Sequence, residues 1–390
     1  MLGLQDLVWL LLPVAAGSGW WAAKRSVHAK RVRPHEHNPV YFRGLNYLLN
    51  EEPDKAIDVF VEMLEVDSDT VETHLALGNL FRRRGEVERA IRIHQNLIAR
   101  PALTAEQRGQ ALLELGQDYL RAGLYDRAEN LFNELRQARQ HVPQALRNLL
   151  RIYQQERDWD ACLKTAEELE RHVDENRSVE KAHYYCELAI RAEREGQQKQ
   201  AIHFLRKALS EDRRCVRANH LLGKMALARG DTADALRLLS ATIEQNPDYL
   251  PEVLDEIVEA YRALGQRDRL KGFLQDMAEH YPNQGAELHL VDLVREQQGE
   301  EAAVDYLTTY IAGSPSLLGL MRLLELQCNK PGGRNDSLLQ QVRNQLRHLI
   351  QDRVGYQCGK CGFEAKMLHW QCPSCHAWGT LKHYPLRESQ

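Results

Sequence analysis

The sequence predicts an all-α protein in which a long array of paired helices is followed by a small C-terminal module that contains four cysteines. Three observations support this prediction. Leu, Ala, Arg, Glu and Gln dominate the 390 residues, and these side chains lose little conformational freedom in a helix. A helix-turn-helix pattern recurs along most of the chain, and four of the eight cysteines gather near its C-terminal end. A chain of this length exceeds a single compact core, whereas a repeat array adds its core unit by unit.

The charge of the chain is close to balanced, with 51 Lys and Arg residues against 55 Asp and Glu residues and a formal net charge of -4. A protein that binds a phosphate backbone generally carries a cationic excess. The composition therefore argues against a nucleic-acid partner.

Residues 1–23 are predicted to be a transmembrane anchor. The segment from Leu7 to Ala23, LVWLLLPVAAGSGWWAA, contains no charged residue. As a helix, residues 1–23 would rise about 34 Å, enough to cross a hydrocarbon core of about 30 Å. Residues 24–38 form a basic juxtamembrane linker, in which five Lys or Arg side chains precede the first acid, Glu36. Basic residues that flank a membrane-spanning helix stay on the cytoplasmic side. We therefore expect the N-terminus to lie outside the cytoplasm and the bulk of the chain to lie in the cytoplasm.

Two other interpretations of this segment remain open. A cleaved secretory signal would carry positive charge ahead of the apolar run, whereas here Asp6 precedes the run and the basic cluster follows it. A buried helix of a soluble protein is the second alternative, because Pro13 and the Gly17–Gly19 cluster weaken the apolar signal.

Four cysteines are scattered along the predicted helices. A cytoplasmic location argues against a disulfide framework. We therefore interpret them as single buried thiols that act as small apolar residues. These residues are Cys162, Cys186, Cys215 and Cys328.

Residues 39–315 are predicted to form a repeat array. Two neighbouring units, HLALGNLFRRRGEVERAIRIHQNLIARP and LLELGQDYLRAGLYDRAENLFNEL, share a Leu-Gly pair, a later aromatic residue, a turn Gly and an Ala. The Gly of that pair, or its replacement, recurs every 34 to 39 residues, at Gly44, Gly78, Gly116, Leu150, Ala189, Gly223, Val258 and Asp292. A unit of helix, turn and helix in about 34 residues resembles the tetratricopeptide repeat, least closely in the last two units. The predicted fold is therefore an all-α, tetratricopeptide-like helical solenoid.

The first helices of such units usually line a concave face on which partner segments lie. Candidate partner contacts on this face are polar, and in the unit around Gly78 they are Asn79, Arg82 and Arg83. A solvated charged face is the alternative for these three residues. The Leu, Ala and Tyr residues of the repeat frame are assigned to helix packing and not to a partner site.

Residues 316–352 are predicted to form two capping helices, LLGLMRLLELQC and SLLQQVRNQLRHLIQD, separated by the breaker NKPGGRND. A terminal helix with one apolar side and one charged side would close the array. Gly332 and Gly333 lack the following Lys-Ser/Thr of a phosphate loop, which argues against a nucleotide site.

Residues 353–384 are predicted to form a metal-binding module, followed by a tail at residues 385–390. Two Cys-x-x-Cys pairs stand ten residues apart in CGKCGFEAKMLHWQCPSC. Each pair can present two thiolates to one ion, and two pairs complete a tetrahedron that selects zinc or iron. His369 and His376 lie nearby but are not needed, because four thiolates fill the site. The predicted ligands of the single ion are Cys358, Cys361, Cys372 and Cys375.

The runs CGKCGF and CPSC resemble the knuckles of rubredoxin-type and zinc-ribbon modules. Two departures argue against electron transfer: the pairs are closer together than in rubredoxins, and His376 stands where a rubredoxin usually has Gly. A module this small has little apolar surface, so metal binding must supply much of its folding energy. We expect docking on the helical array to bury its exposed rings, which are Tyr356, Phe363, Trp370 and Trp378.

The order of anchor, repeat array and four-cysteine module, with the runs HLALGNLFRRRGEVERAIRIHQ and YQCGKCGF, resembles the lipopolysaccharide assembly protein B family from end to end. The resemblance implies a single-pass protein of the bacterial inner membrane with a periplasmic N-terminus. It also implies an adaptor or scaffold that regulates lipopolysaccharide synthesis by presenting the deacetylase LpxC to the membrane protease FtsH and by gathering other synthesis proteins. Only the four cysteines carry over residue by residue, as metal ligands.

Other classes of function have weaker support in the sequence. A membrane-tethered redox protein with a cycling iron in the module is the main alternative, and a nucleic-acid-binding zinc ribbon is disfavoured by the balanced charge. The sequence contains no nucleophile elbow, zinc-protease helix motif or phosphate loop, so we expect a protein without enzymatic activity. The choice between zinc and iron, and the existence of a homo-oligomer, stay open.

Overall fold

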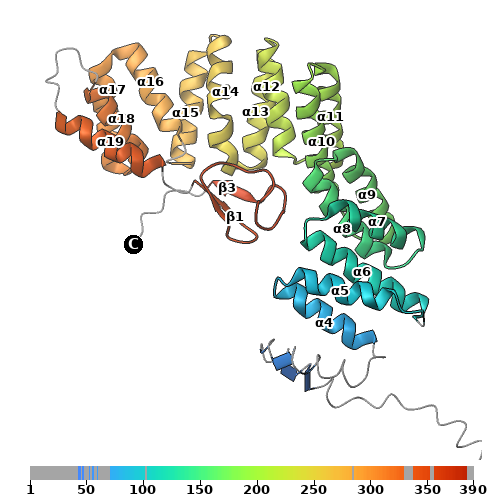
Figure 1. Ribbon diagram of the computed structural model, residues 1–390. Coiled ribbons are helices and arrows are strands. Elements are labelled where there is room, and N and C mark those ends of the chain that lie inside the picture. The colour runs from blue at the N-terminus through green and yellow to red at the C-terminus, as the bar shows by residue number, and fades with distance from the viewer. Residues whose placement is uncertain are drawn as a thin grey trace, which may run out of the picture. The chain divides into compact units, whose positions relative to one another are not determined.

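The computed structural model describes residues 71–101, 103–282, 285–328, 337–351 and 355–383, with a few isolated positions between 43 and 59 (Figure 1). The predicted anchor, basic linker, breaker and tail lie outside the described residues. Among the helices that are described, none combines the length and apolarity that a membrane crossing requires. The chain divides into two compact units, Met1–Ile152 and Tyr153–Gln390.

In the first unit, helices pack in consecutive pairs. α4 (Val71–Arg83) packs against α5 (Val87–Ile98), and α6 (Ala105–Arg121) packs against α7 (Tyr125–Gln137). The boundary between the units falls within α8 (Val142–Glu156).

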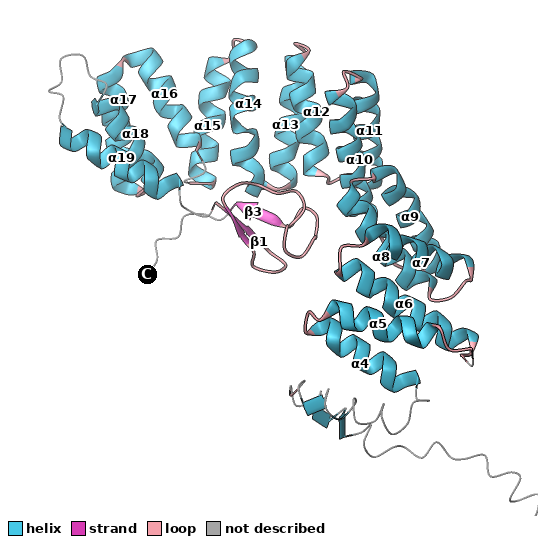
Figure 2. Cartoon of the chain, viewed as in Figure 1, coloured by secondary structure: helices cyan, strands magenta, loops and turns pink. Residues whose placement is uncertain are grey.

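The second unit continues the alternation of helices and short turns (Figure 2). Its helices are α9 (Trp159–His172), α10 (Ser178–Arg194), α11 (Gln198–Glu211), α12 (Val216–Ala228), α13 (Thr232–Gln245), α14 (Leu250–Ala263), α15 (Arg267–His280), α16 (Ala286–Gln298), α17 (Glu300–Gly313), α18 (Leu317–Cys328) and α19 (Ser337–Gln351). A short 3-10 helix, η1 (Pro247–Tyr249), joins α13 to α14. The predicted tetratricopeptide-like solenoid is confirmed for the described part of the array.

A small antiparallel sheet forms the C-terminal module. Its central strand β1 (Tyr356–Cys358) pairs with β2 (Glu364–Ala365) on one side and with β3 (Leu381–His383) on the other. The core of the module is minimal, and its buried members are Cys358, Ala365, Cys372 and Leu381. Two of these four core residues, Cys358 and Cys372, are predicted metal ligands, so the metal site overlaps the core of the module.

The recurring Gly position of the repeat pattern lies where the two helices of a pair approach each other most closely. A Cβ atom at Gly223 of α12 would lie 2.7 Å from Leu239 of α13, and one at Gly116 of α6 would lie 2.6 Å from Phe132 of α7. The second helices present fully buried alanines, which are Ala90, Ala128, Ala201 and Ala235. The assignment of the frame positions to helix packing is therefore confirmed for these pairs.

The turn within a pair uses a residue with positive φ to end the first helix. Gly85 has a φ of 82°, and the N–H of Glu86 then donates to the carbonyl of Phe81 at 2.9 Å, which closes the last turn of α4. Arg157 takes the same role after α8 with a φ of 58°.

Helices α18 and α19 lie within residues 316–352, where the sequence predicts two capping helices. α19 carries no acidic residue, and three of its large apolar side chains are exposed, namely Leu338, Val342 and Leu349. The exposed surface of α19 also carries the charged side chain of Arg347, so it combines apolar and basic side chains.

Gly223→Ala tests the close helix crossing. We expect it to lower the free energy of unfolding by about 1–3 kcal/mol, because Leu239 must leave its rotamer or the two helices must separate. Gly272→Ala in α15 is the control, since a Cβ atom there meets nothing within 4 Å and should add up to about 1 kcal/mol of helix stability. Thermal unfolding followed by circular dichroism measures both changes. Equal shifts in the two variants would contradict the packing role of Gly223.

Candidate metal centre

The first cysteine pair lies in a tight turn at the end of β1. The N–H of Gly362 donates to the carbonyl of Cys358 at 2.9 Å, and the N–H of Cys358 donates to the carbonyl of Phe363 at 2.8 Å. Gly362 turns the chain with a φ of 75°, a conformation that Gly adopts without steric cost. The turn brings the Sγ atom of Cys361 within 4.8 Å of that of Cys358.

The second cysteine pair repeats this geometry with a different turn residue. The N–H of His376 donates to the carbonyl of Cys372, and the N–H of Cys372 donates to the carbonyl of Ala377, both at 2.9 Å. His376 has a φ of 57° and so takes the place that Gly362 holds in the first turn. Because His is among the residues that tolerate this conformation, the departure from Gly leaves the knuckle intact.

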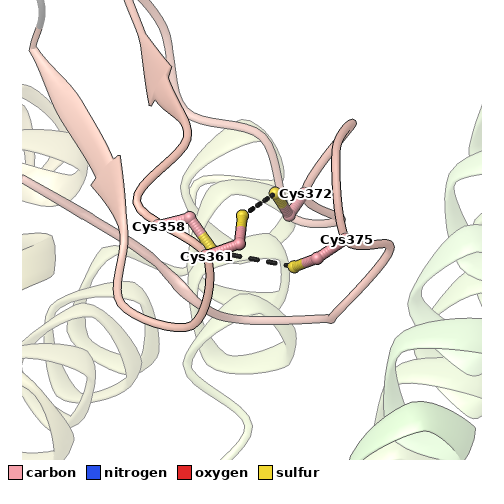
Figure 3. Close-up of side chains that lie close together, drawn as sticks. All are labelled: Cys358, Cys361, Cys372 and Cys375. Carbon is pink, nitrogen blue, oxygen red and sulfur yellow. Dashed lines mark hydrogen bonds between the residues drawn. The ribbon is translucent and has the colours of Figure 1, made fainter. Parts of the chain in front are cut away.

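The four sulfurs converge in a small cluster (Figure 3). The Sγ atoms of Cys358 and Cys375 are 3.8 Å apart, those of Cys361 and Cys372 are 3.7 Å apart, and all four lie within 4.8 Å of one another. Zinc–sulfur bonds of about 2.3 Å in a tetrahedron give sulfur–sulfur edges of about 3.8 Å, whereas a disulfide requires about 2.0 Å. The cluster therefore fits one tetrahedral metal ion and does not fit two disulfides.

The surroundings of the sulfurs affect their ionisation unequally. Burial works against ionisation of Cys358, but the Thr380 hydroxyl, 3.3 Å from its Sγ atom, and backbone N–H groups of the knuckle bring its pKa down to about 6. Burial raises the pKa of Cys372 to about 11. A bound cation removes this obstacle, because coordination to a metal deprotonates a thiol outright. The donor set thus matches a soft cation such as zinc or iron.

Trp378 is the main contact between the module and the helices of the second unit. Its buried ring stacks on His183 of α10, with ring centroids 5.0 Å apart. It also meets Trp159 of α9 and Tyr184 of α10 edge-on, at 6.0 and 5.9 Å. The fit continues at Gly379, where a Cβ atom would lie 3.2 Å from the Nε2 atom of His183. Aromatic pairs of this kind contribute about 0.5–1.5 kcal/mol each beyond their area burial.

Trp370 provides a second ring contact with the same helices. It stacks on Tyr249 of η1 at a centroid distance of 5.2 Å, with the ring planes 9° apart. The guanidinium of Arg217, at the start of α12, lies 5.5 Å from the ring centre of Trp370 and 5.9 Å from that of Trp378. Glu187 of α10 binds the same guanidinium at 2.7 Å. Both rings therefore pack against the array as predicted, Trp378 buried and Trp370 partly buried.

Polar contacts around these rings fix the orientation of the module. They pair Tyr249 with the carbonyl of Leu381, Asp248 with Lys382, Glu252 with Tyr356, and Gln154 with Gln371. Burial and the nearby charge of Arg217 lower the pKa of His183 to about 3, so its ring is neutral at the interface. The array side thus offers one cation, Arg217, to two indole faces, with a neutral imidazole beside it.

The remaining predicted residues of the module have other positions. Phe363 packs on the module's own small core. His369 and His376 do not belong to the sulfur cluster, and His376 acts through its backbone conformation. The prediction that neither histidine is needed as a metal ligand agrees with the geometry of the four sulfurs.

Two of the three candidate partner contacts in the first unit are already committed to a network within the array. Arg82 binds Glu114 at 2.6 Å and Asp118 at 2.8 Å, and it donates to the Oδ1 atom of Asn79 at 2.7 Å. Both acids belong to α6, the first helix of the next pair. Arg82 and Asn79 therefore stabilise the stacking of repeats, and only Arg83 of the three has an exposed side chain.

The array residues that contact the module were not predicted from the sequence. His183 and Arg217 are polar side chains at buried positions of the first helices α10 and α12. A polar residue at a helix position where the repeat pattern predicts a buried apolar side chain is the one sequence signal that could have identified them. That signal does not identify the residues that they contact, because Trp370 and Trp378 lie more than 150 residues further along the chain.

Comparisons with known proteins agree with both parts of this architecture. Tetratricopeptide repeat profiles match residues 73–108, 113–170 and 192–255, and a profile described as a rubredoxin metal binding domain matches residues 356–383. The chain is 39% identical over 388 residues to lipopolysaccharide assembly protein B of Escherichia coli strain K12, covering 98% of this chain and 99% of that protein. It is 36% identical over 390 residues to the protein of the same name from Haemophilus influenzae, covering 97% and 98% respectively.

Removing one cysteine from each knuckle should release the metal and unfold the module. In Cys358→Ala/Cys372→Ala we expect no stoichiometric metal and rapid hydrogen exchange over residues 356–383, because metal binding supplies much of the folding energy of such a module. Helix content by circular dichroism should be nearly unchanged, since the array has its own core. His376→Gly is the control, because Gly accepts the same backbone conformation. Retention of the metal in the double variant would contradict the four-thiolate site.

A graded pair of substitutions at Tyr249 should separate docking from metal binding. Tyr249→Phe keeps the ring stack on Trp370 and loses one hydrogen bond, so we expect it to weaken docking by about 0.5–1.5 kcal/mol. Tyr249→Ala loses the stack as well and should weaken docking by about 3–5 kcal/mol. Hydrogen exchange over β3 and metal analysis measure the two effects. If Tyr249→Ala left exchange in β3 unchanged, the ring stack would not hold the module.

Proposed function

The chain belongs to the lipopolysaccharide assembly protein B family, and we propose that it acts in lipopolysaccharide assembly as an adaptor that binds other proteins and catalyses no reaction itself. The single observation that carries this proposal is similarity over nearly the whole chain to relatives with that name. The relatives' name does not favour the alternative of an electron-transfer protein.

The chemistry of the cysteine cluster supports a structural role for the metal. Four protein thiolates complete a tetrahedral shell, whereas a catalytic zinc keeps a position open for water or substrate. We propose that one zinc or iron ion is held by Cys358, Cys361, Cys372 and Cys375, and that it stabilises the module without taking part in a reaction.

The position of the module supports an adaptor in which the module and the array together form one binding surface. Trp370 and Trp378 bind helices α9, α10 and α12 together with η1, so the module covers part of the array and fixes the neighbouring helices. Arrays of this repeat type present extended surfaces to partner proteins. We propose that such partners bind the array beside the docked module and require both parts.

We propose that residues 1–23 anchor the chain in the bacterial inner membrane, with the N-terminus periplasmic and the array cytoplasmic. Such a tether raises the local concentration of the array near other membrane proteins. We propose that it regulates lipid A synthesis there by presenting the deacetylase LpxC to the membrane protease FtsH, and that it gathers other synthesis proteins.

Turnover of LpxC in cells tests this function. Depletion of the chain should lengthen the half-life of LpxC several-fold, because the protease would lose its adaptor, and re-expression of the wild type should restore rapid turnover. Cys358→Ala/Cys372→Ala should fail to restore it, while His376→Gly should succeed. Crosslinking in membranes should recover FtsH or a lipid A enzyme. An unchanged half-life after depletion, with only unrelated proteins crosslinked, would exclude the proposed partners.

A further inference from the structure

Two buried cysteines meet between α10 and α12, the helices that carry His183 and Arg217. The Sγ atoms of Cys186 in α10 and Cys215 at the start of α12 lie 4.0 Å apart, and both residues are buried in the same apolar cluster. They are free thiols, at a distance well above the sulfur–sulfur bond of about 2.0 Å. The two thiols therefore already face one another across adjacent repeats.

The setting of Cys215 favours reaction at its sulfur. It is the N-cap residue of α12, and the backbone N–H of Ala218 donates to its carbonyl oxygen at 3.1 Å. A hydrogen bond from Cys186, this backbone N–H and the charge of Arg217 lower the pKa of Cys215, although burial works in the opposite direction. Helix N-termini and neighbouring cations are the features that make a cysteine nucleophilic. Cys215 itself is buried, but the turn directly before it, residues 213–214, is exposed.

Cys162 shows how a buried thiol without these features behaves in the same unit. It lies in α9 and is fully buried. Burial and the nearby charge of Asp158 raise its pKa well above the ordinary value, which suits an inert packing residue. The pKa of Cys162 is raised and that of Cys215 is lowered, so burial alone does not account for the setting of Cys215.

We propose that Cys186 and Cys215 form a dithiol oxidation site whose substrate is a hydroperoxide. The Cys215 thiolate attacks the peroxide oxygen, the O–O bond breaks, and a sulfenic acid forms on Cys215 while water or an alcohol leaves. The thiol of Cys186 then attacks the Cys215 sulfur, a sulfur–sulfur bond forms, and the sulfenic oxygen departs as water with the Cys186 proton. The thiol pair is oxidised by two electrons and the peroxide is reduced by two.

Formation of this disulfide changes the surface that holds the module. The two sulfurs must approach by about 2 Å to bond, which draws the start of α12 toward α10. Arg217 lies two residues beyond Cys215, and Glu187 lies next to Cys186. These two side chains form the ion pair that places a guanidinium over Trp370 and Trp378. Oxidation of the pair therefore loosens the docking of the module while the array stays folded.

The experiment uses the full, metal-loaded and reduced chain, titrated with hydrogen peroxide. We expect digestion and mass spectrometry to detect a Cys186–Cys215 disulfide at doses that leave Cys162 unmodified and the metal content unchanged. Hydrogen exchange over residues 370–381 should then rise by about tenfold and return to its original rate after treatment with a thiol reductant. This outcome is independent of any role in lipopolysaccharide assembly.

Variants decide whether the pair itself is responsible. Cys215→Ser and Cys186→Ser should abolish the response of residues 370–381 to peroxide, and Cys162→Ser should leave it intact. Cys215→Ala serves as a second variant should the serine disturb the apolar cluster. The proposal is overturned if the wild-type chain forms no such disulfide before its metal is lost, if the disulfide forms without a change in exchange, or if Cys215→Ser responds to peroxide as the wild type does.

Discussion

The convergence of four cysteine sulfurs is the constraint on which the C-terminal part of this protein depends. The module has three short strands and four buried core residues, and two of those residues are Cys358 and Cys372. Such a core is too small to stabilise a fold by apolar burial alone. A metal ion bound by the four cysteines would supply the stability that the core lacks. The two knuckles would then hold Trp370 and Trp378 where they contact the helices.

The fold and the metal site could be predicted because their signals are local or periodic. The helix pairs follow from a pattern of Gly, aromatic and Ala positions that recurs every 34 to 39 residues. Gly223 belongs to this pattern because Leu239 leaves no room for a Cβ atom there. The Cys-x-x-Cys spacing fixes each knuckle within a few residues. His376 in place of Gly was a departure in sequence, yet it adopts the conformation that the turn requires.

Contacts between distant segments could not be predicted in the same way. Tyr249 and Leu381, for example, are 132 residues apart, and no periodicity connects them. Arg82 was interpreted as a partner contact because it is a polar residue on the first helix of its unit, where such arrays usually bind partner segments. Glu114 and Asp118 neutralise it from the next pair, 32 and 36 residues along the chain. A separation close to one repeat places side chains on adjacent first helices, so charges separated by one repeat should be examined for pairing before they are assigned to a partner.

Docking and metal binding are linked because both depend on one small folded module. The metal is bound only by folded knuckles, and the folded knuckles are further stabilised by contact with α10, α12 and η1. By linkage, whatever stabilises the docked state also increases apparent metal affinity, and loss of the metal weakens docking by the same free energy. Arg217 occupies the centre of this coupling, because its guanidinium contacts both tryptophans while Glu187 ties it to the neighbouring repeat. The contact between α10 and α12 and the contact of the module with the array therefore share one side chain, although none of the metal ligands belongs to either helix.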